Sequence, residues 1–531
     1  MSQTKTSPDT GLNKGLILAV MVAGAFVAIL NETLLNVALP PIMNELKITA
    51  NTAQWLTTAY MLTNGVLIPV SAFLIQRFST RTLFITAMGL FAAGTLIAAV
   101  APDFAFLLVA RVVQASGAAI MLPLLMNVVL SIFSVEERGG AMGIMGLVIT
   151  FAPAIGPTLS GWIVGNHSWR VLFWIVLPIA VIDIIFAMVS LRNVTQLTAP
   201  KIDILSVVLS TFGFGGLLYG FSEAGNGGWN RATVIVSLAV ALVGLVLFTW
   251  RQLSAKNPML EFRVFRYNMF TLTTIISILI TMTMFSAMLL LPLYLQNIRG
   301  FTPFRSGLLV LPGAILMGIM SPITGKIFDK IGARWLAVIG SALTVGTMFH
   351  FTRLTDSTTY LSLAISYAIM MFGMSLLMMP IMTAGLNQLP QRLNPHGTAM
   401  SNTLQQVAGA IGTALLVTVM TDQTKAQLTK LLASFGGNAA QLQQTAAQAA
   451  SQAGAKVSQT PSASQAAMVT AMKHATIHGM NDAFMLATVI AALAFVLTFF
   501  IKRTHPPVED SDAVHVEPEG RTKPRTLIEG T

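Results

Sequence analysis

Ala152-Pro153-Ala154-Ile155-Gly156-Pro157-Thr158-Leu159-Ser160-Gly161 lies inside a long apolar segment and decides the fold class of this 531-residue chain. A proline inside a soluble helix costs about 3 kcal/mol, yet this run holds two. Such a helix is tolerated where neighbouring membrane helices satisfy the freed carbonyl groups, and small residues let those neighbours approach closely. The run predicts a tightly packed membrane helix. A helix that is merely kinked for packing, with no part in function, is the alternative interpretation.

The composition supports the same class. Hydrophobic residues make up 54% of the chain and charged residues only 10%, with a mean hydropathy of +0.73. Soluble domains carry about 25% charged residues, so we expect a polytopic membrane protein. The absence of cysteine excludes disulfides and thiolate metal sites. The net charge of +11 does not indicate nucleic-acid binding, because Lys and Arg fall mainly between apolar spans.

Fourteen spans of about 20 apolar residues each are predicted along the chain. They lie near 16–38, 53–75, 82–100, 104–128, 141–163, 169–191, 202–222, 232–251, 269–293, 305–325, 335–353, 359–383, 399–421 and 481–501.

The distribution of basic residues predicts that both termini are cytoplasmic. An even number of spans puts the termini on one side, and Lys and Arg number about 20 in the inside segments against about 10 outside. The N-tail, 1–15, leads into a retained first helix rather than a removed signal peptide. The tail 502–531 reads as disordered. We expect a multi-pass protein of the bacterial cytoplasmic (inner) membrane.

The chain also repeats itself. Ala72–Arg81 is echoed by Gly325–Arg334, Ala152–Gly156 by Ala408–Gly412, and Gly139–Met142 by Gly397–Met400, at offsets of 253, 256 and 258 residues. Spans 1–6 therefore correspond to spans 9–14. The predicted fold is all-α: two six-helix bundles, 16–192 and 257–421 completed by 481–501, with two inserted helices in 193–256. Two such bundles around a cavity suit a transporter that alternates access by rocking one half against the other.

Several motifs resemble one family. Leu30-Asn31-Glu32-Thr33-Leu34-Leu35-Asn36-Val37-Ala38-Leu39-Pro40 is similar to the first-helix motif of the fourteen-helix drug:proton antiporters of the major facilitator superfamily, the group of EmrB, QacA and LmrB. Arg111-Val112-Val113-Gln114-Ala115-Ser116-Gly117 is similar to its fourth-helix arginine motif, and the run 152–161 to its fifth-helix antiporter motif. The resemblance implies proton-coupled export of amphipathic drugs or toxic compounds.

The chain departs from the family pattern at two places. The usual first-helix aspartate is Asn31, followed by the acid Glu32. The aspartate of the loop after the second span is Gln76, whereas the second copy keeps Asp329. The departures imply that the coupling acid has moved by one residue and that the gating loop of the first half is weaker.

Three charged residues inside spans, Glu32, Arg111 and Asp183, are candidates for proton coupling. Glu32 and Arg111 are expected at similar depths, displaced from the centres of their spans toward the outer face of the membrane by about 7 Å and about 6 Å. A charge at this depth costs at least about 2.5 kcal/mol, so each is expected to face a cavity or a partner. Arg111 either stabilises deprotonated Glu32 during the cycle or clamps helices together. Glu32 either carries protons or serves as a structural or substrate-binding acid.

Asp183 lies in the inner half of the sixth span. It is a candidate second proton site, although we favour a helix-packing or cavity-edge acid.

A substrate cavity is predicted from polar and methionine side chains. Methionine is flexible and polarisable, so a methionine-rich wall suits a binder of varied apolar molecules. Simple packing is the alternative, because methionine occurs on more than one face of span 359–383. The candidate cavity residues are Asn31, Asn36, Asn64, Gln114, Met374, Met378, Asn402 and Gln405.

The repeated loops and the antiporter run supply candidate gating residues. These are Arg77, Arg81, Pro153, Gly156, Pro157, Gly161, Gly325, Asp329, Gly332 and Arg334.

The segment 422–480 is predicted to be an extracellular loop rich in Ala and Gln, with helix at Thr424–Leu432 and Asn438–Gln452. It either gates the outer mouth or serves as a connector.

Three function classes are considered. A proton-driven drug exporter and an exporter of a physiological solute or lipid both fit the motifs, since fold alone does not fix function. A membrane enzyme or a passive channel is the third. The sequence shows no nucleophile–base pair, no metal-ligand cluster and no phosphate-binding loop, so we expect no enzyme, no metal and no cofactor beyond a proton gradient. The expected partners are small amphipathic molecules, protons and the bilayer, with no nucleic acid. The chain is expected to act as a monomer, with a separate adaptor protein only in a Gram-negative cell.

Overall fold

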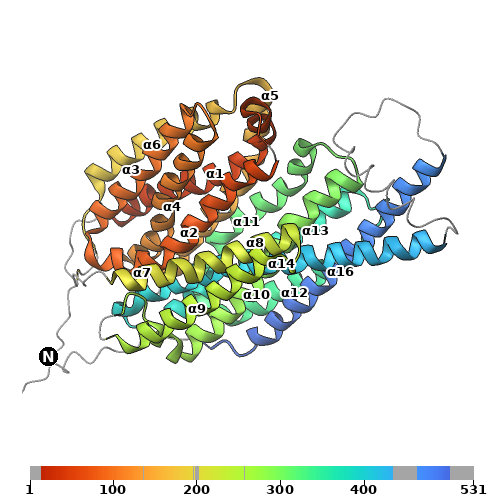
Figure 1. Ribbon diagram of the computed structural model, residues 1–531. Coiled ribbons are helices and arrows are strands. Elements are labelled where there is room, and N and C mark those ends of the chain that lie inside the picture. The colour runs from red at the N-terminus through yellow and green to blue at the C-terminus, as the bar shows by residue number, and fades with distance from the viewer. Residues whose placement is uncertain are drawn as a thin grey trace, which may run out of the picture.

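The computed structural model describes residues 13–48, 50–135, 137–194, 197, 203–255, 258–434 and 463–502, which form helices and no strand. The N-terminal half contains α1 (Lys14–Leu46), α2 (Ala50–Arg77), α3 (Thr80–Ala99), α4 (Phe104–Ile132), α5 (Arg138–Asn166) and α6 (Arg170–Ser190). The C-terminal half contains α10 (Asn268–Leu293), α11 (Pro303–Ile331), α12 (Ala333–Phe351), α13 (Tyr360–Leu386), α14 (Asn394–Ser434) and α16 (Ala463–Thr498). Figure 1 shows the halves as two bundles side by side.

Two further membrane segments join the halves. The first consists of α7 (Ile204–Ser210), the π-helical turn η1 (Thr211–Gly215) and α8 (Gly216–Gly227); the second is α9 (Ala232–Ser254). A 3-10 turn, η2 (Phe262–Arg266), leads into α10, the π-helical turn η3 (Tyr294–Ile298) extends α10, and a 3-10 turn, η4 (Gln391–Leu393), precedes α14.

The predicted spans all coincide with helices. In the described part of the chain, thirteen helical segments are long and apolar enough to cross a membrane. The one predicted span outside these thirteen, 335–353, coincides with α12, a helix of 19 residues. The predicted all-α membrane fold with fourteen helices is confirmed.

Helix ends are fixed by local chemistry. Ser79, Asp103, Thr302 and Thr359 precede helices and accept hydrogen bonds from backbone N–H groups of the first turn. Gly332 joins α11 to α12 at a φ of 80°, a conformation that side-chain-bearing residues rarely adopt. Its N–H group donates to the carbonyl of Phe328, which ends α11.

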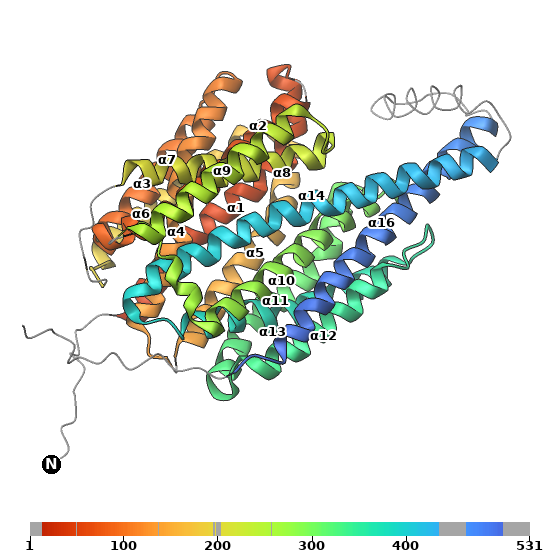
Figure 2. The same ribbon diagram turned by 60° about the horizontal axis from the view of Figure 1, so that its bottom comes forward.

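The inserted segments contact both halves. On the side of the N-terminal half, Tyr219 of α8 stacks on Trp55 of α2. On the side of the C-terminal half, Trp229, just after α8, donates a 2.7 Å hydrogen bond to Thr418 of α14. Segment α8 therefore lies along the seam between α2 and α14 (Figure 2).

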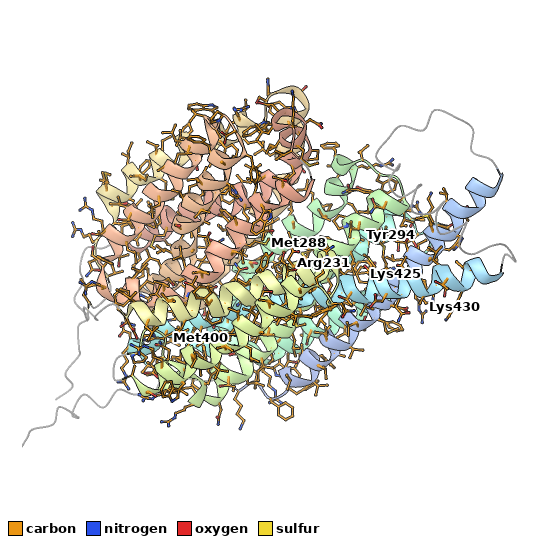
Figure 3. The ribbon with its side chains drawn as sticks, in the orientation of Figure 1. Arg231, Met288, Tyr294, Met400, Lys425 and Lys430 are labelled. Atoms are coloured by element: carbon orange, nitrogen blue, oxygen red, sulfur yellow. The ribbon has the colours of Figure 1, made fainter. Side chains whose placement is uncertain are left out.

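The segment 422–480 differs from a simple loop in its described part. Helix α14 continues to Ser434 and α16 begins at Ala463, so the two helices run on together beyond the bundle. Lys425 and Lys430 lie on this extension of α14 (Figure 3). The predicted helix at Thr424–Leu432 agrees with the structure, whereas the one at Asn438–Gln452 lies outside the described residues.

Candidate functional site

A buried arginine organises a polar cluster inside the N-terminal half. Arg111 of α4 is fully buried. Its Nη1 group donates to the side-chain oxygens of Asn31 at 2.9 Å and Gln114 at 3.0 Å. Its Nε group donates to the carbonyl of Leu56 at 3.4 Å, and its guanidinium lies 4.1 Å from the ring centre of Tyr60. Residues from α1, α2 and α4 therefore hold the charge in place.

The cluster continues into α3. The Gln114 amide donates to the Thr95 hydroxyl at 2.8 Å, and that hydroxyl donates to the carbonyl of Phe91 at 2.7 Å. A chain of hydrogen bonds thus fixes Gln114 before it contacts Arg111, and buried polar groups need such partners.

Glu32 lies beside this cluster without joining it. Its carboxyl group interacts electrostatically with Arg111 and Tyr60. No ion pair within 4.0 Å joins Glu32 to Arg111, although both residues belong to the described part of the chain. Glu32 and Arg111 therefore interact only over a longer distance, and Asn31 makes the direct contact with Arg111 that the sequence suggested for Glu32.

The antiporter run lies against α1 next to Glu32. A methyl group added at Gly156 would collide with the Thr33 side chain, and the Ser160 hydroxyl donates to the carbonyl of Leu34 at 2.7 Å. The run thus packs α5 on the residues that directly follow Glu32. Pro153 is half-buried and Gly161 faces open space, whereas the side chain of Pro157 lies outside the described residues.

Asp183 lies elsewhere in the same half. It is 5% exposed on α6, and its Oδ2 atom lies against Gly24 of α1 beside Phe84 of α3. This oxygen has no hydrogen-bond partner. Gly24 precedes Asn31 by about 10 Å along α1, so the structure does not bring Asp183 to the Arg111 cluster.

One end of the molecule is closed by a contact between the halves. The carboxylate of Asp329, near the end of α11, accepts hydrogen bonds from the backbone N–H groups of Gly139 at 2.9 Å and Gly140 at 3.2 Å. These groups belong to the first turn of α5, whose own N-cap residue, Glu137, makes no side-chain cap. Gly325 sits so close to Gly139 that a methyl group would overlap its carbonyl. An acid at a helix N-terminus is electrostatically favourable.

A second, pseudo-symmetric contact lies between the end of α2 and the start of α14. Gln76 is the repeat counterpart of Asp329, and its side-chain nitrogen lies 2.7 Å from Nε2 of His396. The backbone N–H of Glu261 reaches Nδ1 of the same ring at 3.3 Å. Nearby, Arg138 at the start of α5 donates a 2.9 Å hydrogen bond to Asn387, the residue that follows α13. Where the second repeat uses an acid, the first uses an amide and an imidazole ring.

The remaining gating candidates lie around these contacts. Arg77, Arg81 and Arg334 are exposed at helix ends, and Gly332 forms the joint between α11 and α12.

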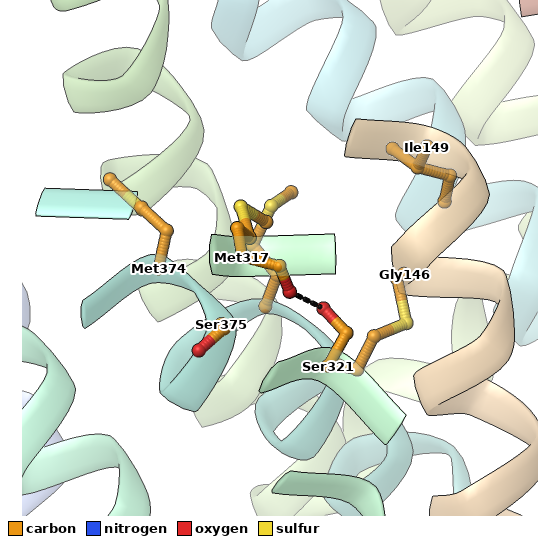
Figure 4. Close-up of a pocket in the computed structure, with 8 residues that line it drawn as sticks. Gly146, Ile149, Met317, Ser321, Met374 and Ser375 are labelled. Carbon is orange, nitrogen blue, oxygen red and sulfur yellow. Dashed lines mark hydrogen bonds between the residues drawn. The ribbon is translucent and has the colours of Figure 1, made fainter. Parts of the chain in front are cut away.

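Two of the predicted cavity methionines line a crevice between the halves (Figure 4). It is a narrow crevice, too tight in this conformation to hold a ligand, and is bounded by α5, α11 and α13. Its lining comprises Gly146, Ile149, Met317, Ser321, Met374, Ser375, Met378 and Met379. Met374 and Met378 therefore share a surface with three other apolar side chains at the seam.

The other cavity candidates are spread over the same region. Asn402 of α14 contacts the sulfur of Met126 of α4 across the seam at 3.4 Å. Asn64 is buried with its Oδ1 atom unpaired, and Gln405 is half-buried. The side chain of Asn36 lies outside the described residues.

The family model described as Major Facilitator Superfamily matches residues 21–413. The chain belongs to the major facilitator superfamily. It is 50% identical over 501 residues to the uncharacterized MFS-type transporter YcnB of Bacillus subtilis (strain 168), covering 94% of this chain and 98% of that protein. It is 49% identical over 412 residues to the lincomycin resistance protein LmrB of Listeria monocytogenes (strain EGD-e), covering 78% and 88%.

The fold comparison agrees with the sequence comparison. The human organic anion transporter MFSD10 (TETRAN) superimposes with a TM-score of 0.62 at 11% identity, covering 92% of this chain and 99% of the human one. This likeness shows the fold alone. The protein is thus a membrane-spanning transporter of the superfamily, as the motifs of the first, fourth and fifth helices predicted.

Sequence reasoning missed two residues of this superfamily member. Tyr60 in α2 and His396 before the membrane core of α14 both make site contacts. The repeat offset of 258 residues pairs His396 with Arg138, which was a usable signal, because the two lie at equivalent helix starts. Tyr60 gave no signal of this kind.

Proposed function

We propose that this protein is a secondary exporter of amphipathic drugs or toxic compounds, driven by proton entry and working by alternating access. The relatives named for lincomycin resistance and for multidrug transport support the substrate class. The observation that carries the proposal is the position of Glu32: an acid at membrane depth on α1, next to Asn31, which binds the fully buried Arg111, and next to Thr33 and Leu34, on which the antiporter run of α5 packs.

The two halves give the proposed mechanism its moving parts. In the conformation described here, Asp329 and the first turn of α5 close one end of the seam. Opening that end requires these hydrogen bonds to break. Proton and substrate drive the change only through their different affinities for the two conformations.

We infer that the closed end is cytoplasmic, because both termini and the basic loops are expected on that side of the bacterial membrane. The structure then corresponds to the outward-facing side of the cycle. Glu32 takes up a proton from outside as substrate leaves, and substrate arriving from the cytoplasm or inner leaflet promotes proton release inside. The proton gradient is the only energy source in this scheme, which uses no cofactor and no metal.

The protein is proposed to work as a monomer, with any adaptor encoded by a separate chain. The extension of α14 and α16 would then lie on the outer face, where it either gates the mouth or contacts such a partner.

The proposal is tested by uptake of lincomycin and of ethidium into inside-out vesicles that contain the protein. An imposed gradient, acidic inside, is expected to drive accumulation that collapses when a protonophore is added. Accumulation that ignores the gradient would indicate a passive channel. If neither compound accumulates but a proton leak is induced by a membrane lipid or metabolite extract, the substrate is a physiological solute and the drug assignment is wrong.

A further inference from the structure

The two inserted segments pack together as one unit, which we call the inserted hairpin: α7, η1 and α8 on one side and α9 on the other. Gly213 of η1 lies so close to α9 that a methyl group there would come within 3.1 Å of the backbone nitrogen of Leu245. Where α7 begins and α9 ends, the Gln252 amide donates a 2.6 Å hydrogen bond to the Ser206 hydroxyl. Helices that meet at backbone distance and share a buried hydrogen bond move as one body.

Two hydrogen bonds tie the inserted hairpin to the C-terminal half. Where α9 ends, the N–H group of Leu260, in the segment that joins α9 to α10, donates to the Gln252 side chain at 3.2 Å. At the opposite end of the hairpin, the Trp229 indole donates to the Thr418 hydroxyl of α14 at 2.7 Å. Breaking such a bond leaves a polar group without its partner, which costs free energy at membrane depth. The hairpin is therefore anchored to the C-terminal half near both of its ends.

The hairpin meets α2 of the N-terminal half through apolar side chains and ring faces. Leu218 of α8 lies directly on Gly65 of α2, where an added methyl group would be 2.0 Å from the Leu218 Cδ1 atom. The Tyr219 ring stacks on Trp55 with the ring centres 5.8 Å apart. Contacts of this kind leave no polar group unpaired when they shift, and membrane helices gain no hydrophobic energy by keeping one register.

The position of α8 makes one of these two sets of contacts change during transport. Helices α2 and α14 meet where Gln76 contacts His396 and diverge from there, with α8 between them (Figure 2). Alternating access rocks one half of the protein against the other. A body that contacts α2 on one side and α14 on the other cannot keep both sets of contacts when α2 and α14 move relative to each other.

We propose that the inserted hairpin is a moving wall, which travels with the C-terminal half, slides on α2 at Leu218 and Tyr219, and covers the α2–α14 side of the seam toward the bilayer in both conformations. The inference rests on the alternating access of the proposed function, but on neither its substrate nor its proton coupling. Gly65 is the notch that Leu218 occupies in the conformation described here. Notches on a helix surface recur about once per turn, so a slide to the next one covers about 5.4 Å.

The test opens the closed end of the molecule without any substrate. Gly325→Trp cannot pack there, because even a methyl group at this position overlaps the Gly139 carbonyl. Spin labels attached at Thr233→Cys on α9 and Lys425→Cys on α14 report the distance from the hairpin to the C-terminal half. Labels at Thr233→Cys and Ala105→Cys, on α4, report its distance to the N-terminal half. All three positions are exposed, and the chain has no cysteine of its own.

Pulsed electron paramagnetic resonance measures both distances with and without Gly325→Trp in the full chain. We expect Gly325→Trp to shift the Thr233–Ala105 distance by roughly 5 Å, one helical turn, and to leave the Thr233–Lys425 distance unchanged. A shifted Thr233–Lys425 distance, or an unshifted Thr233–Ala105 distance, overturns the inference.

Controls separate the opening of the closed end from the bulk of the new side chain. Gly346→Trp places the same ring on α12 at a position with open space around it, and is expected to change neither distance. If Gly325→Trp does not fold, Gly139→Trp blocks the same contact from α5 and is expected to give the same shift. If the distances behave as expected while the wild type accumulates neither lincomycin nor ethidium, the proposed substrate class is wrong and the role of the hairpin stands.

Discussion

The contact between Asp329 and the start of α5 gives a prediction whose size follows from the structure. Its carboxylate accepts two backbone hydrogen bonds, from Gly139 and Gly140, at a helix end that has no side-chain cap of its own. Asp329→Asn keeps the shape but removes the charge and one acceptor. A charge at a partly buried helix N-terminus is worth up to about 2 kcal/mol, and a charged hydrogen bond exceeds a neutral one by about 1 kcal/mol.

These magnitudes predict a loss of about 2 kcal/mol in the closed conformation relative to the open one. Since 1.4 kcal/mol is about tenfold in an equilibrium constant, the ratio of closed to open molecules is expected to fall about 30-fold. Transport is expected to lose coupling before it loses substrate binding, because the change lies far from the Arg111 cluster.

The chain suits a direct measurement, because it has no cysteine of its own. Spin labels attached at Arg192→Cys and Lys330→Cys, both exposed at the closed end, report the distance between the halves by pulsed electron paramagnetic resonance. Asp329→Asn is expected to move population from the short to the long distance. Asp356→Asn, an exposed acid of the C-terminal half outside this contact, serves as the matched control. An unchanged distance distribution in Asp329→Asn would show that the contact of Asp329 with Gly139 and Gly140 does not stabilise the closed conformation.

Three further predictions concern single residues. Trp169→Phe removes a 2.8 Å hydrogen bond to Glu45 and should lower the free energy of unfolding by about 1 to 2 kcal/mol, measured by thermal melting in detergent. Trp335→Phe, at an exposed ring, serves as the control and should change the stability little. Equal melting temperatures of the two variants would contradict a stabilising role of the Trp169–Glu45 hydrogen bond. Asp183→Asn should preserve gradient-driven transport and its pH profile, because a neutral side chain of the same shape serves packing equally well; lost coupling would make Asp183 a proton carrier. Arg251, with help from Ser206, holds the pKa of Asp203 at about 2, so the pair stabilises the protein above about pH 4 and this contribution disappears as the pH falls toward 2. The difference in stability between wild type and Asp203→Asn should be less than about 1 kcal/mol, because the ion pair is partly exposed. This difference should disappear as the pH falls from about 4 toward 2. A difference that stays constant with pH would show that the Asp203–Arg251 ion pair is not its cause.

Much of the fold could be predicted because its signals are periodic and long. Hydropathy predicted the position of each span, and the internal repeat identified Gln76 and Asp329 as equivalent positions from the sequence alone. The run 152–161 predicted close packing, and Gly156 does lie against Thr33. Such signals survive because lipid demands a long apolar helix and close approach demands small residues.

The contacts inside the site could not be predicted in the same way. Counting residues along the helices predicted that Arg111 and Glu32 lie at the same depth in the membrane. The rotation of α1 about its axis decides which side chain faces Arg111, and it is Asn31 rather than Glu32 that makes the hydrogen bond. Tyr60 lies in an apolar helix, where a tyrosine is expected only to pack against its neighbours. The Gln76–His396 contact joins two halves whose relative placement no local pattern encodes.

The central claim is that Glu32 couples proton movement to export. The direct test compares wild type with Glu32→Gln in inside-out vesicles, measuring gradient-driven lincomycin or ethidium uptake and, separately, substrate exchange without a gradient. We expect Glu32→Gln to lose the gradient-driven uptake and to retain exchange, because the neutral amide cannot carry a proton but leaves the movement of the two halves intact. Uptake that still follows the gradient in Glu32→Gln would show that Glu32 is not the coupling residue and that the coupling site lies away from α1.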